Sequence, residues 1–317
     1  MRILFIADPI DKLKPATDSS LALLRGSLEK QWENFWANGQ SVEFVGDGVG
    51  VWAEKVSHSP VGGLPSLEKK QWHPINAFDA VLIRKDPPFD SDYVKLCWLL
   101  LLAEKKVFMM NRPSLLLRYH EKLVPLEARA QGFLEKEDVI PTHIGSHEAA
   151  KSFVDTLKVA KVITKPFLGF GGGNIALHSR QEFHETKPSQ VNDSLVQPFK
   201  EEVTKFGDRR VFFLAGELLA HFVRMPKEGG FVSNLAQGGS AVLSPLSPRE
   251  VLVTEKLGRF LKATGIAFAG ADLIGHLVSE VNLTSPTGLM ALEKLEQKSY
   301  VGPILDFVEK QIKLFRP

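Results

Sequence analysis

Cysteine is almost absent from this chain, because its 317 residues include only Cys97. A single cysteine excludes an internal disulfide and a cysteine metal cluster. It lies in the apolar run CWLLLLA, where we expect a buried, unreactive thiol. No run approaches the ~20 apolar residues of a membrane-spanning helix. The start MRILFIADP has too short an apolar run for a signal peptide. We therefore expect a cytoplasmic protein.

The chain also lacks an excess of charge of either sign. The 39 Lys and Arg residues against 37 Asp and Glu residues leave a net charge of only +2, so no strong field would recruit nucleic acid or an anionic membrane. Basic residues do not alternate with aromatic ones in a stripe, and there is no internal repeat or low-complexity tract. The remaining balance, 44% hydrophobic and 24% charged, can bury a sizeable core in two or three domains.

Strand and helix patterns alternate over the first ~120 residues, which predicts a parallel α/β sheet. We expect strands at 2–7, 41–46, 79–85 and 107–111, helices over about 20–37 and 91–105, and a loop-like segment at 47–77. Polar side chains stand at the strand ends, where such sheets bind ligands: Asp8, Arg84, Lys85, Asp86 and Asn111. For any one of them, loop capping or ion pairing is the simpler role.

The rest of the chain mixes shorter elements. Helical pieces are expected within 113–135, and longer helices over 146–158, 248–264 and about 303–315. Strands are expected at 139–145, 161–166 and 195–200, followed by a hairpin over 207–226 that turns at Gly216-Glu217.

A glycine-rich stretch, FLGFGGGNIALH (167–178), follows the strand at 161–166. A dinucleotide fingerprint requires a helix after the glycines, and here NIAL has the pattern of another strand, so that interpretation fails. A strand–glycine loop–strand can instead fold over phosphates and present backbone N–H groups to them. Lys165, at the end of the preceding strand, would supply positive charge. The alternative is a flexible hairpin with a surface lysine.

The segment 265–288 is expected to form two short strands and a polar loop that carry Asp272, Glu280 and Asn282. Such oxygen donors suit a hard cation such as Mg²⁺. Glu280 and Asn282 share one strand face because they are two residues apart. A two-residue loop at Gly275-His276 would place Asp272 on the opposite face, so the metal site requires an odd loop of three or five residues. The alternative is an exposed face with solvated acids.

Two arginines flank the strands of the 207–226 hairpin. Arg210 and Arg224 can clamp phosphate or carboxylate oxygens, or they can be rim residues. The Gly-rich segment 227–241 that follows has the character of a loop that closes over an active site. Gln197 and Phe199 lie in a strand that can present backbone groups to an adenine edge, although these two residues alone are weak evidence.

Taken together, these motifs resemble the ATP-grasp ligases, and most closely the prokaryotic-type glutathione synthetases. The resemblance runs in family order over nearly the whole chain, and the string RKDPPFD is unusual. It is carried by Asp8-Pro9-Ile10, Asp18-Ser19-Ser20, Arg84 to Asp90, Asn111 to Ser114, Glu121-Lys122-Leu123, Lys165-Pro166, Gly207 to Val211, Asn234-Leu235-Ala236 and Glu280 to Thr287.

The resemblance implies a fold of mixed α/β and α+β class. It consists of an N-terminal parallel α/β domain on the substrate side (1–121) and a two-lobed ATP-grasp domain (122–317), with a central lobe at about 122–199 and a C-terminal lobe at about 200–317. The implied reaction joins γ-glutamylcysteine and glycine at the expense of ATP, through an acyl phosphate, and releases glutathione, ADP and phosphate. A homodimer or homotetramer is expected by the same analogy.

Site residues follow from the resemblance in the same way. Arg210 looks like the catalytic arginine that stabilises the phosphoryl group and the tetrahedral intermediate. The implied ATP-binding residues are Lys122, Lys165, Gly171, Gly172, Gly173, Gln197 and Phe199; the substrate-binding residues are Arg84, Asn234, Ser285 and Thr287; and the ligands of two Mg²⁺ (or Mn²⁺) ions are Asp272, Glu280 and Asn282.

The chain departs from the family pattern in two places. Phe231-Val232-Ser233 stands where the family usually has an arginine in the lid, and Leu168 replaces an acidic residue before the glycine loop. Two alternatives therefore stay open. One is an ATP-grasp carboxylate–amine ligase with a different acceptor, and the other is a nucleotide-binding module that has lost turnover.

Overall fold

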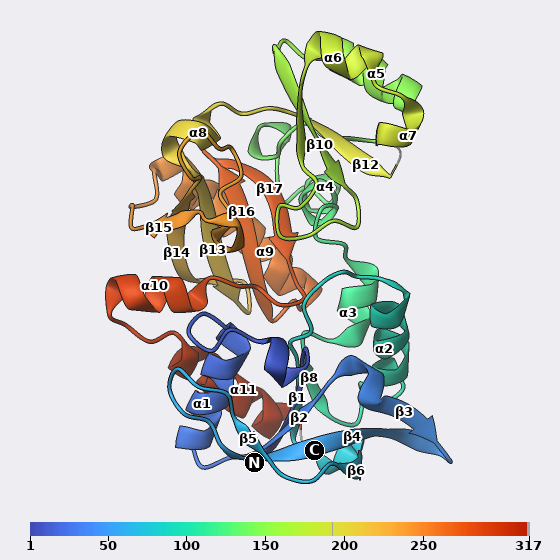
Figure 1. Cartoon of the computed structure of the whole chain (residues 1–317), viewed down its shortest axis with the longest axis vertical. Helices are drawn as coiled ribbons and strands as arrows, with labels where there is room; N and C mark the ends of the chain where they lie inside the picture. The colour runs from blue at the N-terminus through green and yellow to red at the C-terminus, as the bar shows by residue number, and fades with distance from the viewer. Residues whose placement is uncertain (192, 316–317) are drawn as a thin grey trace.

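The first sheet holds the N-terminal part of the chain (Figure 1). The computed structural model describes residues 1–191 and 193–315. Four parallel strands form the centre of this sheet, in the order β2 (Glu33–Ala37), β1 (Arg2–Ile6), β7 (Ala80–Ile83) and β8 (Phe108–Met110). An antiparallel extension adds β3 (Val42–Val45), β4 (Gly48–His58), β5 (Ser66–Leu67) and β6 (Gln71–Pro74). The predicted parallel α/β sheet is confirmed at its centre, whereas the strand predicted at 41–46 is β3, which pairs antiparallel with β4.

Two expectations for this sheet were wrong. The helix predicted to reach Ala37 is α1 (Ser19–Glu29), and residues 33–37 form β2 instead. Its aromatic residues Phe35 and Trp36 are buried, and pairing with β1 outweighs the local helical pattern. The segment 47–77, predicted as a loop, contains the eleven-residue β4. Its glycines concealed an alternation in which Val49, Val51 and Ala53 face the core.

A helix from the far end of the chain covers the first sheet. α11 (Val301–Phe315) packs against α1 and β8 and buries Ile304, Leu305 and Val308. α2 (Ser91–Leu101) packs against β3 and against α3 (Pro113–Arg118). The N-terminal body is therefore completed by residues more than 180 positions beyond its last strand.

The second sheet forms a small separate lobe, at the top of Figure 1. Its strand order is β11 (Ala176–Ser179), β10 (Lys161–Pro166), β12 (Ser194–Pro198) and β9 (His143–Ile144), all antiparallel. The helices α5 (His147–Thr156), α6 (Arg180–Glu185) and α7 (Pro188–Val191) complete it, and Phe183 is buried at its centre. The predicted strand–glycine loop–strand is confirmed, because β10 and β11 flank the glycines and pair with each other.

The third sheet lies between the other two (Figure 1). Its order is β15 (Ser240–Val242), β14 (Glu217–Met225), β13 (Asp208–Leu214), β16 (Phe268–Ile274) and β17 (Leu277–Asn282). The predicted hairpin over 207–226 is confirmed, but it turns at residues 215–216, because Leu214 pairs with Glu217. The other elements of this part of the chain are α4 (Val124–Ala130), α8 (Glu202–Phe206), α9 (Pro248–Thr264) and α10 (Leu289–Glu296). Short 3₁₀ turns complete the fold: η1 (Ile10–Lys12), η2 (Gly39–Ser41), η3 (Ile75–Ala77), η4 (Lys136–Asp138) and η5 (Leu235–Gln237).

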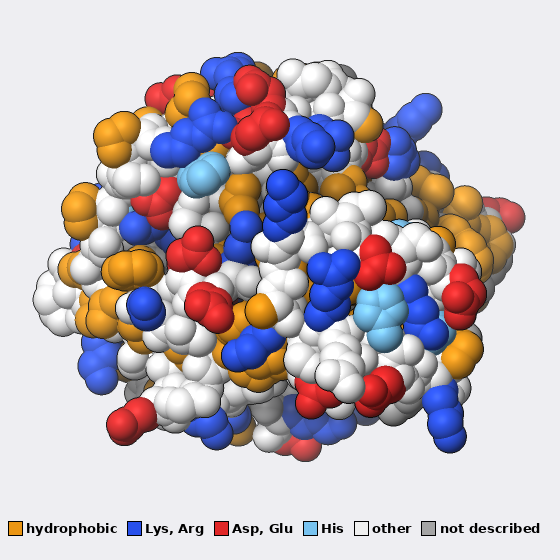
Figure 2. Space-filling view, turned by 90° about the horizontal axis from the view of Figure 1, so that it is seen from above, with side chains coloured by type: hydrophobic (Ala, Val, Ile, Leu, Met, Phe, Trp, Pro, Cys, Tyr) orange, Lys and Arg blue, Asp and Glu red, His pale blue; other side chains and the backbone are white. Residues whose placement is uncertain are grey.

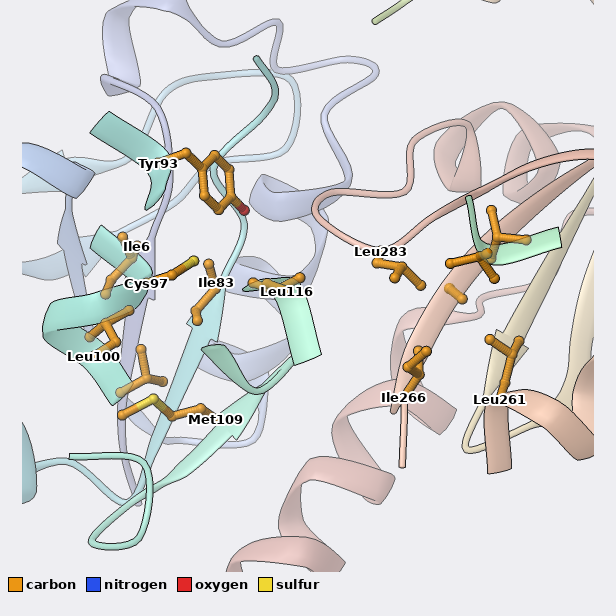
Figure 3. Close-up of a cluster of buried hydrophobic side chains, with 14 of the residues drawn as sticks. Ile6, Ile83, Tyr93, Cys97, Leu100, Met109, Leu116, Leu261, Ile266 and Leu283 are labelled. Atoms are coloured by element: carbon orange, nitrogen blue, oxygen red, sulfur yellow. The ribbon is translucent and has the colours of Figure 1, made fainter. Parts of the chain in front are cut away.

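Buried apolar side chains fill both the first and the third sheet regions. In Figure 3, Ile6, Ile83 and Cys97 lie on the N-terminal side, while Ile266 and Leu283 lie across from them. Cys97 is buried, as expected from the sequence, and burial raises the pKa of its thiol to about 12, which favours the protonated form at neutral pH.

One side chain ties the two sheets together through hydrogen bonds. Asn111, which follows β8, donates its amide to the carbonyls of Phe268 (2.6 Å) and Leu283 (2.7 Å). Its oxygen accepts from the amides of Ala267 and Phe268. Because every polar atom of the Asn111 side chain is used in this way, the residue is structural, not one of the free ligand contacts considered from the sequence.

The surface carries charges of both signs. Seen from above the small lobe, Lys and Arg side chains alternate with Asp and Glu side chains (Figure 2). None of the helices within residues 1–191 and 193–315 has the length and apolar character that a membrane span requires.

Candidate active site

A cleft opens between the small lobe and the third sheet. It is bounded by β10, the glycine loop and β12 on one side, and by β13, β14, β16 and β17 on the other. Most of the implied ATP and metal residues line it: Lys122, Lys165, Gly171, Gly172, Gly173, Gln197, Phe199, Asp272 and Glu280. One implied substrate residue, Asn234, lines it as well. Five other implied residues do not line this cleft: Arg84, Arg210, Asn282, Ser285 and Thr287.

The hairpin β16–β17 brings Asp272 directly opposite Glu280. This pairing agrees with the sequence prediction, but the reason given for it was wrong. The loop has two residues, Gly275 and His276, since Ile274 pairs with Leu277. A bulge between Asp272 and Leu273 then leaves Ser279 with no residue opposite it on β16 and shifts the strand register by one residue. The bulge, and not an odd loop, places both carboxylates on one face.

Glu280 and Asn282 keep free oxygen atoms beside the cleft. The Glu280 side chain is partly buried, and its carboxylate makes no hydrogen bond or ion pair with any described residue. The Asn282 amide donates to Gly270 O at 3.4 Å, which leaves its own oxygen without a donor among the residues that the structure describes. An unpaired carboxylate and a neighbouring amide oxygen are donors that a hard cation can use. Among the described residues, no three His, Cys, Asp or Glu side chains are already arranged so that they could hold a metal ion by themselves.

Asp272 lies in a buried network of opposite charges. Its carboxylate accepts from Arg210 at 2.6 and 3.1 Å and from Arg224 at 2.8 Å. Arg224 also pairs with Asp208 at 2.7 Å. Burial alone would raise the pKa of Asp272, but the two guanidinium groups overcome that effect and lower it to about 2. The carboxylate therefore stays ionised, and both of its oxygen atoms accept from arginine.

Arg210 belongs to this network but does not line the cleft. Arg210, Asp272 and Glu280 form a row across the adjacent strands β13, β16 and β17. The Arg210 guanidinium also donates to Thr287 O at 2.9 Å and is only 4% exposed. The structure thus joins Arg210 to the cleft through Asp272, whereas Arg224 lines the cleft directly.

Two lysines supply positive charge to the cleft. Lys165 on β10 donates to the hydroxyl of Ser279, the bulge residue, at 3.0 Å. Lys122 is buried; it pairs with Glu121 at 2.7 Å and donates to the carbonyl of Gly169 in the glycine loop. Burial and the nearby charge of Glu280, against the opposing effect of Lys122, raise the pKa of Glu121 to about 7.

The loop at 227–239 rests on the glycine loop. Phe231 meets Phe199 edge to face, with ring centroids 5.8 Å apart, and Gln237 Nε2 donates to Gly171 O at 2.9 Å. Gly172 has φ +75°, and a Cβ there would come within 2.7 Å of Val232 Cγ1. Glycine at this position allows both the backbone turn and the close approach.

A second pocket continues from the first. It holds the four implied substrate contacts, Arg84, Asn234, Ser285 and Thr287, and Arg224 and Asn234 line both pockets. Arg84 is buried, and its guanidinium donates to Ser20 Oγ at 3.2 Å and to Pro286 O at 3.3 Å. The two pockets therefore meet at Arg224 and Asn234, beside Asp272.

Sequence reasoning assigned no role to three side chains of the site. Asp208 precedes the arginine pair of β13 and neutralises Arg224; Glu121 precedes Lys122 and pairs with it. In both cases an acidic residue stands next to a basic one in the sequence, and this pattern could have indicated the ion pairs. Ser279 carried none, since its place depends on the bulge.

Two family descriptions match this chain. Residues 133–297 match "Prokaryotic glutathione synthetase, ATP-grasp domain", and residues 1–117 match "Prokaryotic glutathione synthetase, N-terminal domain". Glutathione synthetase of Prochlorococcus marinus subsp. pastoris is 33% identical over 315 residues, which are 96% of this chain and 98% of that protein. The glutathione synthetase of Nitrosomonas europaea is 30% identical and covers 98% of both chains.

Solved structures show the same fold at low identity. D-cycloserine synthetase covers all of both chains with a TM-score of 0.66 at 14% identity. The ATP-grasp ligase PsnB, in complex with a minimal precursor, covers 98% of both chains with a TM-score of 0.62 at 15% identity. This likeness is one of architecture alone.

Proposed function

Because this chain belongs to the prokaryotic glutathione synthetase family, we propose that its two joined pockets make glutathione from γ-glutamylcysteine and glycine. The resemblance found in the motifs is confirmed, and so is the ATP-grasp fold. The chain is an ATP-dependent ligase that forms a C–N bond. The finer assignment gives the cleft between the small lobe and the third sheet to ATP, and the second pocket to γ-glutamylcysteine and glycine.

One observation carries the assignment of the pockets. They meet at Arg224 and Asn234, next to the row that contains Asp272 and Glu280. A ligase of this kind must bring the terminal phosphate of ATP to the carboxylate that it activates. A junction lined by an arginine and flanked by carboxylates is where that transfer is best stabilised.

The reaction needs alignment and charge more than a protein nucleophile. The carboxylate of γ-glutamylcysteine takes the terminal phosphoryl group of ATP, which forms an acyl phosphate and ADP. The glycine amine then attacks the acyl carbon, phosphate leaves, and a proton is released. In our assignment Lys122 and Lys165 hold the phosphates, and Arg224 stabilises the charge that develops at the junction, with Arg210 fixing Asp272 behind it.

The free oxygen atoms of Glu280 and Asn282 fit Mg²⁺ or Mn²⁺. We place two ions there with ATP, held by Asp272, Glu280 and Asn282, and Asp272 keeps its ionised form for this role. Bound Mg²⁺ would neutralise the phosphates of ATP and align them. We also propose that the protein acts in the cytoplasm, as a homodimer or homotetramer.

The direct test is ADP release with Mg-ATP, γ-glutamylcysteine and glycine, omitting each in turn. We expect release only with all three, and glutathione identified by mass. ADP formed without glycine would indicate hydrolysis of the acyl phosphate, or a different amine. No ADP release with any acceptor, despite intact nucleotide binding, would contradict the proposed reaction and favour a binding module.

The lid prediction concerns Phe231. Replacing it with alanine removes the edge-to-face contact with Phe199, so we expect the KM for ATP to rise about 3- to 10-fold. ADP release without glycine should also increase, because the lid then excludes water less well. Steady-state kinetics would measure both effects. Phe206→Ala, at a ring 70% exposed on α8, is the control. If the two variants have the same KM for ATP and the same ADP release without glycine, Phe231 does not act in the site.

A further inference from the structure

Gln197 is a buried residue in the wall of the cleft. It stands on β12 opposite Ile163 of β10, and Lys165 lies two residues further along β10 on the same face. The side chain is only 2% exposed, yet it lines the cleft together with Ile140 and Ile163. If Lys165 binds phosphate, Gln197 lies where the nucleobase of the same ligand would be.

The orientation of the Gln197 amide is set by one hydroxyl group. Gln197 Nε2 donates to Thr142 Oγ1 at 2.9 Å, and Thr142 Oγ1 donates to Ile140 O at 2.8 Å. A hydroxyl has one hydrogen, and Thr142 uses it for the Ile140 carbonyl, so toward Gln197 it can only accept. Turning the amide around would require Thr142 to donate to Gln197, and the Ile140 carbonyl would lose its donor.

The consequence is an unpaired acceptor. Gln197 Oε1 is buried and has no hydrogen-bond partner among the described residues. A buried polar atom without a partner is costly, and a ligand that offers a donor at that point recovers the loss. The walls beside it, Ile140 and Ile163, are apolar and suit the faces of a flat ring.

We propose that Thr142 fixes the Gln197 amide so that the cleft selects a purine with a 6-amino group over one with a 6-oxo group. The inference rests on the proposed function, in which the cleft holds ATP, and it names what reads the base. Adenine presents a donor to Gln197 Oε1. Hypoxanthine presents an acceptor at the same position, so two acceptors would face each other. Thr142 is a positioning residue in this scheme.

The test compares equilibrium binding of Mg-ADP and Mg-IDP, which differ at this position of the base. For the unmodified protein we expect IDP to bind about 10- to 100-fold more weakly than ADP. In Thr142→Val the amide is free to turn and can donate to the 6-oxo group, so the ratio of the two dissociation constants should fall about 10-fold. Gln197→Met, which has neither group, should lose the preference as well.

Two further variants separate positioning from general damage. Thr142→Ser keeps the hydroxyl and should restore the preference. Thr204→Val removes an exposed hydroxyl that donates to Glu201 O at 2.8 Å, in the same local manner but away from the cleft, and should change nothing. Thermal unfolding of each variant shows whether the lobe is intact.

Three outcomes would overturn the inference: equal affinity of the unmodified protein for ADP and IDP, an unchanged ratio in a folded Thr142→Val, or an unchanged ratio in Gln197→Met. Because the measurement is binding and not turnover, it is separate from the proposed reaction. A protein that prefers ADP through Thr142 but releases no ADP with γ-glutamylcysteine and glycine would keep this inference and lose the proposed function.

Discussion

Replacing Glu280 with glutamine is expected to lower glutathione formation about 1,000-fold or more and to leave the fold intact. Glu280 is partly buried and lines the cleft opposite Asp272, and its carboxylate has no hydrogen-bond or ion-pair partner within residues 1–191 and 193–315. Its charge therefore contributes little to folding, while the proposed cation needs it. Glutamine keeps the size of the side chain and removes only the charge.

The measurement is the rate of ADP release with all three substrates, together with thermal unfolding. The control is Glu217→Gln at the tip of the β13–β14 hairpin, an exposed glutamate paired with Lys262, which should retain full activity. Increasing Mg²⁺ concentration should recover part of the activity of Glu280→Gln if the loss reflects weaker cation binding. Turnover near that of the unmodified protein would show that Glu280 lies outside the site.

The second large effect is on stability. Asp272→Asn should lower the free energy of unfolding by about 3–5 kcal/mol, because it leaves the buried guanidinium groups of Arg210 and Arg224 short of negative charge. Asp208 continues to neutralise Arg224, so Arg210 loses most. Denaturant unfolding at neutral pH measures the change. Asp155→Asn, at an exposed aspartate paired with Arg180, is the control and should cost about 1 kcal/mol or less.

The same residue predicts an acid-dependent loss of stability. The folded pKa of Asp272 is lowered to about 2, below the unfolded value of about 3.9. The group therefore contributes stability that is fully present above about pH 4 and is lost as the pH falls through about 2. This contribution is on the order of 2 kcal/mol. Unfolding of Asp272→Asn should depend less on pH in that range. If the free energy of unfolding changes equally with pH in the two proteins, Asp272 is not the group responsible for the acid-dependent loss of stability.

Periodicity and turn residues predicted those elements whose burial is evident locally. The strands β1, β7 and β8 and the helix α9 have long apolar or capped patterns, and they were found as expected. β2 was missed because its aromatic residues are compatible with a helix until β1 lies beside them. β4 was missed because glycines at residues 48 and 50 interrupt its pattern. In both cases the deciding interaction is tertiary.

The site was predictable as a set of residue types, but its geometry was not. The pairing of Asp272 with Glu280 depends on a bulge at Ser279, which leaves no mark in the sequence. Similarly, Asn111 follows a strand of the parallel sheet, where ligand contacts are expected. Its side chain instead makes hydrogen bonds with backbone groups more than 150 residues away in the sequence. Residue type shows which chemistry is available, and partners distant in sequence decide which groups remain free to perform it.

The helix α11 has a consequence for synthesis on the ribosome. The first sheet ends at Met110, but the helix that packs against it begins at Val301, about 190 residues later. At a translation rate of roughly 5–20 residues per second, the sheet waits roughly 10–40 s with apolar side chains uncovered. A nascent chain arrested after the first sheet should therefore bind chaperones strongly, and its release should follow the emergence of α11.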